Sequence, residues 1–334
     1  MEDAIVAEGL RKRFKTHESL RGKKILLASL RRRTFYKQAL DDVSFSVPKG
    51  QIVALLGKNG SGKSTLTKIM TGILFPDSGE IRVLGLDPWK DRIKLAMEIG
   101  VVLGAHGQLF WNLPASDAFE YNRKIYQVPD GTYEKRLAYF VDRLELRDVY
   151  KRQVRQMSLG EQMKCNFVSS CLHMPKIVFL DEPTIGVDLP SKLALRETIS
   201  EMQRRFGTTF ILTTHIVEDI AIAERVIMLD KGKKIFDDTK ENLEKLFGDK
   251  RYITLKFDGR APAKVKMGKV LEREANVLKL EVPHRAIKSR AMMSLLNNDR
   301  VMDYSVSEVD LSYILSKLYR KLEKGKRRGG RYAT

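Results

Sequence analysis

The chain has 334 residues, of which 43% are apolar, and this suits one large domain or two smaller ones with a sizeable core. It contains no apolar run of about 18 residues, so we expect no helix that spans a membrane. Residues 1–5 lack the pattern of a signal peptide. Cys165 and Cys171 are not spaced as a metal or redox pair, which predicts reduced cysteines in a cytosolic protein.

Positive charge is concentrated in two segments of the chain. The formal net charge is +19; residues 10–37 carry eleven Lys and Arg against the single acid Glu18, and residues 317–331 carry eight against Glu323. Such segments suit anionic lipid headgroups, an acidic partner surface or nucleic acid. A further interpretation is that these basic residues are exposed to solvent and bind no partner. Composition alone does not distinguish among these interpretations.

The first two thirds of the chain alternate strand-like and helix-like patterns. Residues 1–14 are typical of a strand followed by basic residues, and residues 15–36 of a basic inserted arm. Residues 39–47 alternate like a strand, and the short apolar run at 51–56 is typical of a buried parallel strand. The alternation continues to about residue 240, which predicts an α/β domain with a mostly parallel sheet.

The pattern changes beyond about residue 250. We expect strands at 252–257, 277–282 and 301–309 and helices at 285–297 and 310–323, which together predict a small α+β domain. The predicted organisation is a first domain at 1–245 that includes the arm, an α+β domain at 250–323, and a basic tail at 324–334.

A glycine-rich segment follows the buried strand predicted at 51–56. It fits the phosphate-loop pattern G-x-x-x-x-G-K-[ST] without substitution, through Gly57, Lys58, Asn59, Gly60, Ser61, Gly62, Lys63 and Ser64. Its glycines allow backbone N–H groups to wrap a phosphate, and the start of the following helix attracts the anion. We expect Lys63 to reach the β- and γ-phosphates of ATP, Ser64 to bind Mg²⁺, and Thr65 to donate to the α-phosphate.

Two acids, Asp181 and Glu182, end the apolar run at 177–180. The carboxyl end of a buried parallel strand is where ligands bind in such sheets. Asp181 suits the shell of Mg²⁺, and Glu182 suits a general base that polarises an attacking water. Together with Lys63, this pair of carboxylates predicts an ATP-hydrolysing site.

Three further segments resemble the ATP-binding subunits of ABC transporters, and the resemblance covers residues 1–245. Residues 158–162 (SLGEQ) are similar to the signature LSGGQ, residues 183–188 to the D-loop, and residues 211–215 to the strand that leads to the switch histidine. The resemblance implies a P-loop ABC ATPase cassette with a mostly parallel sheet and a helical subdomain, followed by the small α+β domain.

The resemblance also implies a homodimer. Ser158 and the backbone around Gly160 form a second anion site at a helix start, so each of two ATP molecules is expected between Lys63 of one subunit and Ser158 of the other. His215 is expected to contact the γ-phosphate and to take part in catalysis with Lys63 and Glu182.

The sequence departs from the family pattern in two places. Glu161 stands where the signature has its second glycine. The position of the Q-loop glutamine holds Gly104 or Ala105. Gln108, slightly later in the chain, is our candidate for this role as a metal ligand, with His106 as a substitute.

The aromatic residue that stacks on adenine has candidates on both sides of the arm. Phe14 fits the family position before the arm, while Phe35 and Tyr36 lie just after it. Phe14 and Tyr36 are both kept as nucleotide-binding candidates.

Residues 103–114 and 158–164 resemble an exporter branch of the family whose permease is a separate chain. This implies separate transmembrane permease subunits and a peripheral location on the cytoplasmic face of the cell membrane. Residues 103–114 include four apolar side chains that belong either to the core or to a groove that receives the permease. They are Leu109, Phe110, Trp111 and Leu113.

A soluble ABC ATPase that acts on nucleic acid or ribosomes is the alternative function, and the basic segments keep it open. The resemblance disfavours nucleic acid as a partner, because DNA-repair members insert long coiled coils and translation factors carry two cassettes, whereas this chain has one uninterrupted cassette. A scaffold without turnover is disfavoured by the intact set of Lys63, Asp181, Glu182 and His215.

Overall fold

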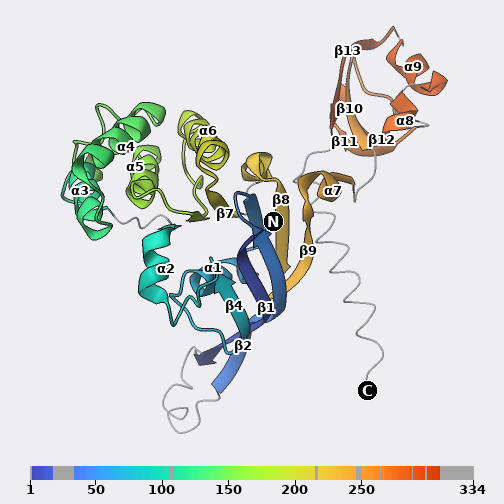
Figure 1. Cartoon of the computed structure of the whole chain (residues 1–334). Helices are drawn as coiled ribbons and strands as arrows, with labels where there is room; N and C mark the ends of the chain where they lie inside the picture. The colour runs from blue at the N-terminus through green and yellow to red at the C-terminus, as the bar shows by residue number, and fades with distance from the viewer. Residues whose placement is uncertain are drawn as a thin grey trace, which may run out of the picture. The chain divides into compact units, whose positions relative to one another are not determined.

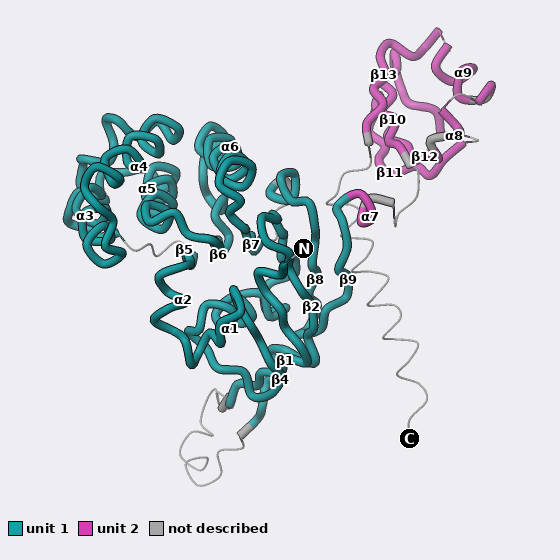
Figure 2. Tube along the Cα trace, in the orientation of Figure 1, with its two compact units in different colours: residues 1–240 teal, residues 241–334 magenta. Residues whose placement is uncertain are grey.

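The chain folds as two compact units, residues 1–240 and residues 241–334, which are described separately (Figure 2). The computed structural model describes residues 2–17, 34–104, 109–214, 217–245, 250–263, 265, 267–287, 289–297 and 299–308. No helix in these ranges combines the length and the apolar character that a membrane crossing requires.

A six-stranded sheet forms the centre of the first unit (Figure 1). Its strands, in spatial order, are β5 (Ile99–Leu103), β6 (Ile177–Asp181), β7 (Thr209–Thr214), β3 (Ile52–Leu56), β8 (Arg225–Asp230) and β9 (Lys233–Thr239). All neighbouring pairs are parallel except the β8–β9 pair. The predicted α/β class with a mostly parallel sheet is therefore confirmed, and the carboxyl ends of β3, β6 and β7 meet at one edge.

A second, antiparallel sheet consists of β2 (Thr34–Pro48), β1 (Asp3–His17) and β4 (Ser78–Val83), in that order. The strand predicted at 39–47 begins earlier, at Thr34, because β1 and β2 continue as a hairpin with Lys15 opposite Tyr36 and His17 opposite Thr34. The ends of the predicted arm are thus strand. Its remainder, residues 18–33, lies outside the described residues.

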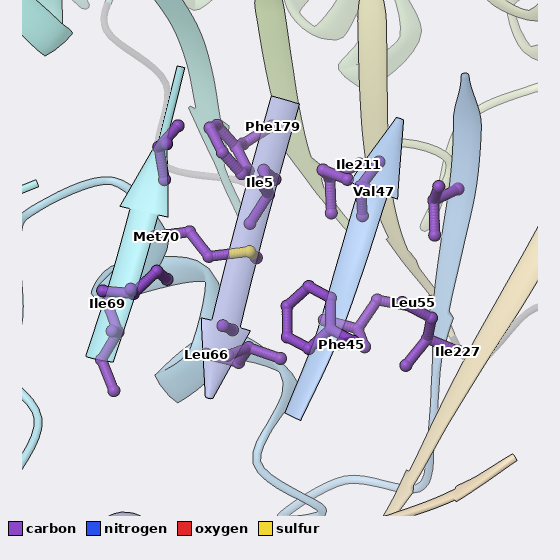
Figure 3. Packing of buried hydrophobic residues seen from close by; sticks show 14 of the residues in the cluster. Ile5, Phe45, Val47, Leu55, Leu66, Ile69, Met70, Phe179, Ile211 and Ile227 are labelled. Atoms are coloured by element: carbon purple, nitrogen blue, oxygen red, sulfur yellow. The ribbon is translucent and has the colours of Figure 1, made fainter. Parts of the chain in front are cut away.

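One hydrophobic cluster joins the two sheets and α1 (Lys63–Met70) (Figure 3). Ile5 and Val47 come from the antiparallel sheet, Leu55 and Ile211 from the parallel sheet, and Leu66 from the helix; each is at most 3% exposed. Burying each such side chain contributes about 1.5–3 kcal/mol. This packing fixes α1, and with it the glycine-rich segment before it.

The remaining helices of the first unit include a group formed by α3 (Ala115–Ile125), α4 (Asp130–Arg143) and α5 (Leu159–Cys171), which lie together in green in Figure 1. Phe140 of α4 and Phe167 of α5 meet edge to face with ring centroids 6.2 Å apart. Cys165 and Cys171 are free thiols buried in α5. Burial raises the pKa of Cys165 to about 12, so both cysteines act as core residues.

Three further helices connect the strands of the first unit: α2 (Arg92–Glu98), α6 (Leu189–Phe206) and the 3-10 helix Val217–Ile222. The 18-residue α6 begins at Asp188, whose side chain accepts a hydrogen bond from the Ser191 N–H, and ends at Gly207 in the left-handed conformation. These caps explain where the helix starts and stops. A short helix, α7 (Lys240–Lys245), follows β9.

The second unit contains a four-stranded antiparallel sheet in the order β11 (Lys269–Arg273), β12 (Val277–Pro283), β10 (Lys250–Phe257) and β13 (Val301–Glu308). Three of these strands match the predicted segments, and β11 was not predicted. The helix expected at 285–297 is two short helices, α8 (His284–Ile287) and α9 (Arg290–Leu296). The helix predicted at 310–323 and the tail at 324–334 lie outside the described residues.

Candidate functional site

The glycine-rich segment connects the end of β3 to the start of α1, and packing requires glycine at two of its positions. A Cβ on Gly57 would lie 2.6 Å from the Leu229 carbonyl oxygen, and one on Gly62 would lie 2.5 Å from the Ala39 carbonyl oxygen. Gly60 has a φ of +78° with open space around it. Lys58, Asn59 and Gly60 are exposed. The loop is thus fixed at both ends and open in the middle.

Lys63, at the start of α1, is 4% exposed. Its Nζ donates a hydrogen bond to the Gly57 carbonyl at 2.6 Å and lies 3.9 Å from Oε1 of Glu182. Burial lowers the pKa of Lys63, and the negative charges of Glu182 and Asp181 oppose that shift. The ammonium group therefore lies inside the loop, between a carbonyl oxygen and a carboxylate, where an anion on the loop can reach it.

The predicted carboxylates lie at the end of β6, next to the end of β7. Asp181 accepts a hydrogen bond from the Thr213 hydroxyl, and the Glu182 N–H donates to the Thr213 carbonyl at 2.9 Å. Glu182 has a φ of +54°, a left-handed conformation that is uncommon for residues other than glycine. The structure therefore brings Lys63 within 3.9 Å of Glu182 and places Asp181 directly before that glutamate.

Two hydroxyl side chains predicted to bind the phosphates and the metal lie in the first turn of α1. Ser64 is exposed and Thr65 is half-buried. Thr213, by contrast, was missed as a site residue. Its position at the end of a strand next to the carboxylates was visible in the sequence, but its pairing with Asp181 depends on the strand order.

The signature segment is the amino-terminal cap of α5. Ser158 Oγ accepts a hydrogen bond from the Glu161 N–H at 3.2 Å, and the Glu161 carboxylate accepts one from the Ser158 N–H at 2.7 Å. Arg152 lies 2.6 Å from the same carboxylate. Burial raises the pKa of Glu161, but the hydrogen bonds from Ser158 and Arg152 outweigh it and leave the pKa lowered. The glutamate that departs from the family signature thus completes a capping box.

Gly160 has a packing role in addition to the predicted anion site. A Cβ at this position would lie 2.3 Å from Oδ1 of Asp188 and 2.7 Å from Oγ of Ser191. The signature helix α5 therefore contacts the start of α6 so closely that only glycine fits.

The two adenine-stacking candidates lie on opposite faces of the β1–β2 hairpin. Phe14 is paired with Lys37, and Tyr36 is paired with Lys15; successive residues of a strand point to opposite faces. Phe14 is 39% exposed and Tyr36 is 64% exposed, so both rings are accessible. Gln108 and His215, and with them the alternatives Ala105 and His106, lie outside the described residues.

A phosphate loop on a parallel sheet, with a buried lysine facing two strand-end carboxylates, defines a P-loop nucleotide-binding protein. The family model described as ABC transporter matches residues 40–185. NatA of Bacillus subtilis (strain 168), an ABC transporter ATP-binding protein, is 31% identical over 207 residues, which cover 62% of this chain and 84% of NatA. SrtF of Streptococcus pyogenes, a lantibiotic transport ATP-binding protein, is 34% identical over 214 residues, which cover 63% of this chain and 90% of SrtF.

The fold has solved counterparts as well. A dimeric structure of the ATP-binding cassette MJ0796 in a post-hydrolysis state with ADP and Pi has a TM-score of 0.59 at 21% identity, and the match covers 70% of this chain and 98% of that one. The chain belongs to the ATP-binding proteins of ABC transporters, which bind ATP and hydrolyse it to drive transport.

Proposed function

We propose that this chain is the motor subunit of an ABC-type exporter, working as a homodimer around two ATP and driving separate permease subunits at the cytoplasmic face of the cell membrane. The observation that carries the proposal is the position of the Lys63 ammonium, 2.6 Å from the Gly57 carbonyl and 3.9 Å from the Glu182 carboxylate. A charge that can hold the phosphates thus lies beside a base that can accept a proton from water.

ATP is expected to lie with its phosphates on residues 57–65. Lys63 holds the β- and γ-phosphates, and its present partner, the Gly57 carbonyl, is replaced by phosphate oxygens. The oxygen donors Ser64 and Asp181 are of the type that Mg²⁺ prefers, and Gln108 is proposed as a further ligand. When bound, Mg²⁺ supplies positive charge against the phosphate oxygens.

Hydrolysis is assigned to Glu182, which accepts the proton of the attacking water, with His215 contacting the γ-phosphate. Ser158 and Gly160 of the second copy complete the site from the opposite side. Two observations support this head-to-tail arrangement: Ser158 is at an exposed helix start where N–H groups attract anions, and the similar cassette MJ0796 is dimeric.

The permease is proposed to dock beside the loop at 103–114. Phe110, Trp111 and Leu113 are 41%, 59% and 45% exposed, so these three are surface residues rather than core. A cavity of about 370 Å³ lies between α2, β5 and α5, with Ile73 and Tyr126 among its lining residues. Apolar side chains and a cavity of this kind suit a helix of a membrane protein.

The separate domains have proposed roles that fit this arrangement. We infer that residues 1–245 are the nucleotide-binding domain, that residues 250–323 are a separate α+β domain, and that the tail at 324–334 and the arm offer positive charge to anionic lipid headgroups. SrtF is named for lantibiotic transport, which supports a role in transport. The name of this relative also favours a transporter over a soluble ATPase that acts on nucleic acid.

Phosphate release by the purified full-length chain tests the proposal. Glu182→Gln should bind ATP normally and lose turnover, because an amide cannot accept the proton. Glu98→Gln is the matched control, since Glu98 forms a surface ion pair with Lys176 at 2.9 Å away from the site. Turnover of Glu182→Gln equal to that of the control would remove Glu182 from the mechanism. Stimulation by duplex DNA, with no response to any permease in anionic lipid, would contradict the transport function.

A further inference from the structure

Asp219 is the centre of a buried polar network that the proposed function leaves unused. The residue is 3% exposed and belongs to the 3-10 helix Val217–Ile222. Its Oδ2 accepts hydrogen bonds from the hydroxyls of Thr184 at 2.6 Å and Thr214 at 2.8 Å, and its Oδ1 accepts one from the Arg196 guanidinium at 2.9 Å. A buried carboxylate is stabilised only when it is paired in this way.

The three donors come from three segments that carry site residues. Thr184 follows Glu182 by two positions in the turn after β6, and Thr214 ends β7 directly after Thr213, which holds Asp181. Arg196 belongs to α6, the helix whose start contacts Gly160. One carboxylate therefore ties the carboxyl ends of two strands to the helix that packs on the signature.

The surroundings of this network leave little room for rearrangement. Thr184 is 4% exposed, Thr214 is 1% exposed, and the ion pair with Arg196 is nearly as buried, with 14% of the arginine side chain exposed. The adjoining cavity has a volume of only about 10 Å³ and is otherwise lined mainly by apolar residues such as Leu180 and Leu212. A cavity of that size holds at most one water molecule, so at most one water in it can replace a lost hydroxyl bond.

We propose that Asp219 is a positioning residue for ATP hydrolysis, an inference that rests on the proposed function of Glu182. The Glu182 backbone is held in a left-handed conformation, with its N–H bonded to the Thr213 carbonyl. Asp219 fixes the chain on both sides of that bond, through Thr184 and Thr214. Loss of the network frees Glu182 to leave this conformation, which displaces its carboxylate from the attacking water.

The network should affect turnover rather than nucleotide binding. None of its four residues belongs to the phosphate loop at 57–64, whose following helix α1 is held by the hydrophobic cluster. If the network positions Glu182, its loss should lower kcat alone. A general loss of structure would also weaken ATP binding.

The test uses size-matched variants of the full-length chain, with kcat and KM from phosphate release and ATP affinity from a fluorescent analogue. Thr184→Val and Thr214→Val should each lower kcat by about tenfold and leave ATP affinity within about twofold. Thr184→Ser and Thr214→Ser keep the hydroxyl and should retain kcat. Because both hydroxyls donate to the same oxygen, the double Val variant should lose less than the product of the two single effects.

Asp237→Asn is the matched control for Asp219→Asn. Asp237 pairs with Arg225 at 2.7 Å and is 12% exposed. Within the described part of the chain its hydrogen-bond donors are Arg225 and Lys234, and neither belongs to the network. Thermal unfolding of every variant is recorded alongside turnover. Both Asn variants should lose stability, and only Asp219→Asn should lose turnover in the protein that remains folded.

Three results overturn the proposal: wild-type kcat in folded Asp219→Asn protein, equal losses of ATP affinity and kcat, or Ser variants as impaired as the Val variants. Glu182→Gln in the same assay distinguishes failure of the proposed function of Glu182 from failure of the proposed role of Asp219. If Glu182→Gln retains turnover, the proposed function of Glu182 fails and positioning by Asp219 fails with it. If Glu182→Gln is inactive while the network variants are fully active, only the role of Asp219 is wrong.

Discussion

Ser158 and Glu161 cap the signature helix reciprocally, with the Ser158 N–H donating to the Glu161 carboxylate at 2.7 Å and the Glu161 N–H donating to Ser158 Oγ at 3.2 Å. This arrangement gives Glu161 a structural role at the start of the signature helix. The Ser158 side chain also contributes a hydrogen bond that lowers the pKa of the Glu161 carboxylate, so both the oxygen and the hydrogen of this hydroxyl belong to the cap.

Replacing this glutamate with glycine should destabilise the first unit. Glu161→Gly removes one capping acceptor and the Arg152 ion pair and adds a flexible residue to the first turn of α5, a loss of about 1–2 kcal/mol in the free energy of unfolding. Glu161→Gln keeps a carbonyl oxygen for the Ser158 N–H and should lose less. Urea unfolding measures both, and equal stability of Glu161→Gly and the wild type would show that the cap contributes nothing.

ATP binding should take up protons at alkaline pH because of Lys63. Burial lowers the pKa of Lys63 below its ordinary value of 10.5. At pH values between this lowered pKa and 10.5, the unfolded chain therefore binds more protons than the folded protein. The stability of the protein without ATP rises with pH in that window. Bound phosphates favour the ammonium form and raise this pKa again. Calorimetry in buffers of different ionisation enthalpy measures the uptake.

The proton uptake has a direct control in Lys63→Arg, whose guanidinium stays charged throughout this range. The variant should bind ATP without the alkaline uptake, even if its affinity is lower. Equal uptake by the wild type and Lys63→Arg would assign the protons to another group.

The glycines of the phosphate loop should tolerate substitution by alanine less well than a glycine with open space and a negative φ. Gly57→Ala places a methyl group against the Leu229 carbonyl oxygen and should lower stability by about 1–3 kcal/mol. Gly60→Ala meets open space and only a positive φ, which costs about 1–2 kcal/mol. Gly131 in α4 also meets open space, without a positive φ, and Gly131→Ala should stabilise the protein by about 0.5–1 kcal/mol. If urea unfolding gives Gly57→Ala and Gly131→Ala the same free energy of unfolding, the packing argument for Gly57 is wrong.

Only one of the two aromatic candidates should bind adenine, because Phe14 and Tyr36 lie on opposite faces of the hairpin. Loss of a ring that stacks on a base weakens binding by about 1–3 kcal/mol, so either Phe14→Ala or Tyr36→Ala should reduce ATP affinity about fivefold or more. The other variant serves as the control and should bind ATP like the wild type. Equal losses in both variants would show that the hairpin changes its structure on binding.

The parts of the site that follow from local sequence were predictable. The phosphate loop lies between a buried strand and a helix because the apolar run at 52–56 and the glycines after it specify that geometry locally. The strand at 177–181 was predictable for the same reason. Lys63 and Glu182 meet because both lie at the carboxyl edge of a parallel sheet.

The contacts that depend on side chains distant in sequence were not predictable. Nothing near Asp219 in the sequence indicates that Thr184 and Arg196 donate to it, and the role of Glu161 required the helix start to be known. Strand β11 was missed because only Val270 and Leu271 are apolar among its five residues, which is too weak an alternation to distinguish a strand from a loop.

The hairpin of β1 and β2 has a consequence for the basic arm. Because His17 and Thr34 are directly paired, the two chain ends that flank residues 18–33 are already at the spacing that a two-residue turn such as Asn-Gly connects. A variant in which a two-residue turn replaces residues 18–33 is therefore expected to keep the pairing of β1 with β2 and to have a shorter connection to close on folding. Residues 18–33 hold six Lys and Arg against Glu18, so about a quarter of the net charge lies in one segment between two paired strand ends.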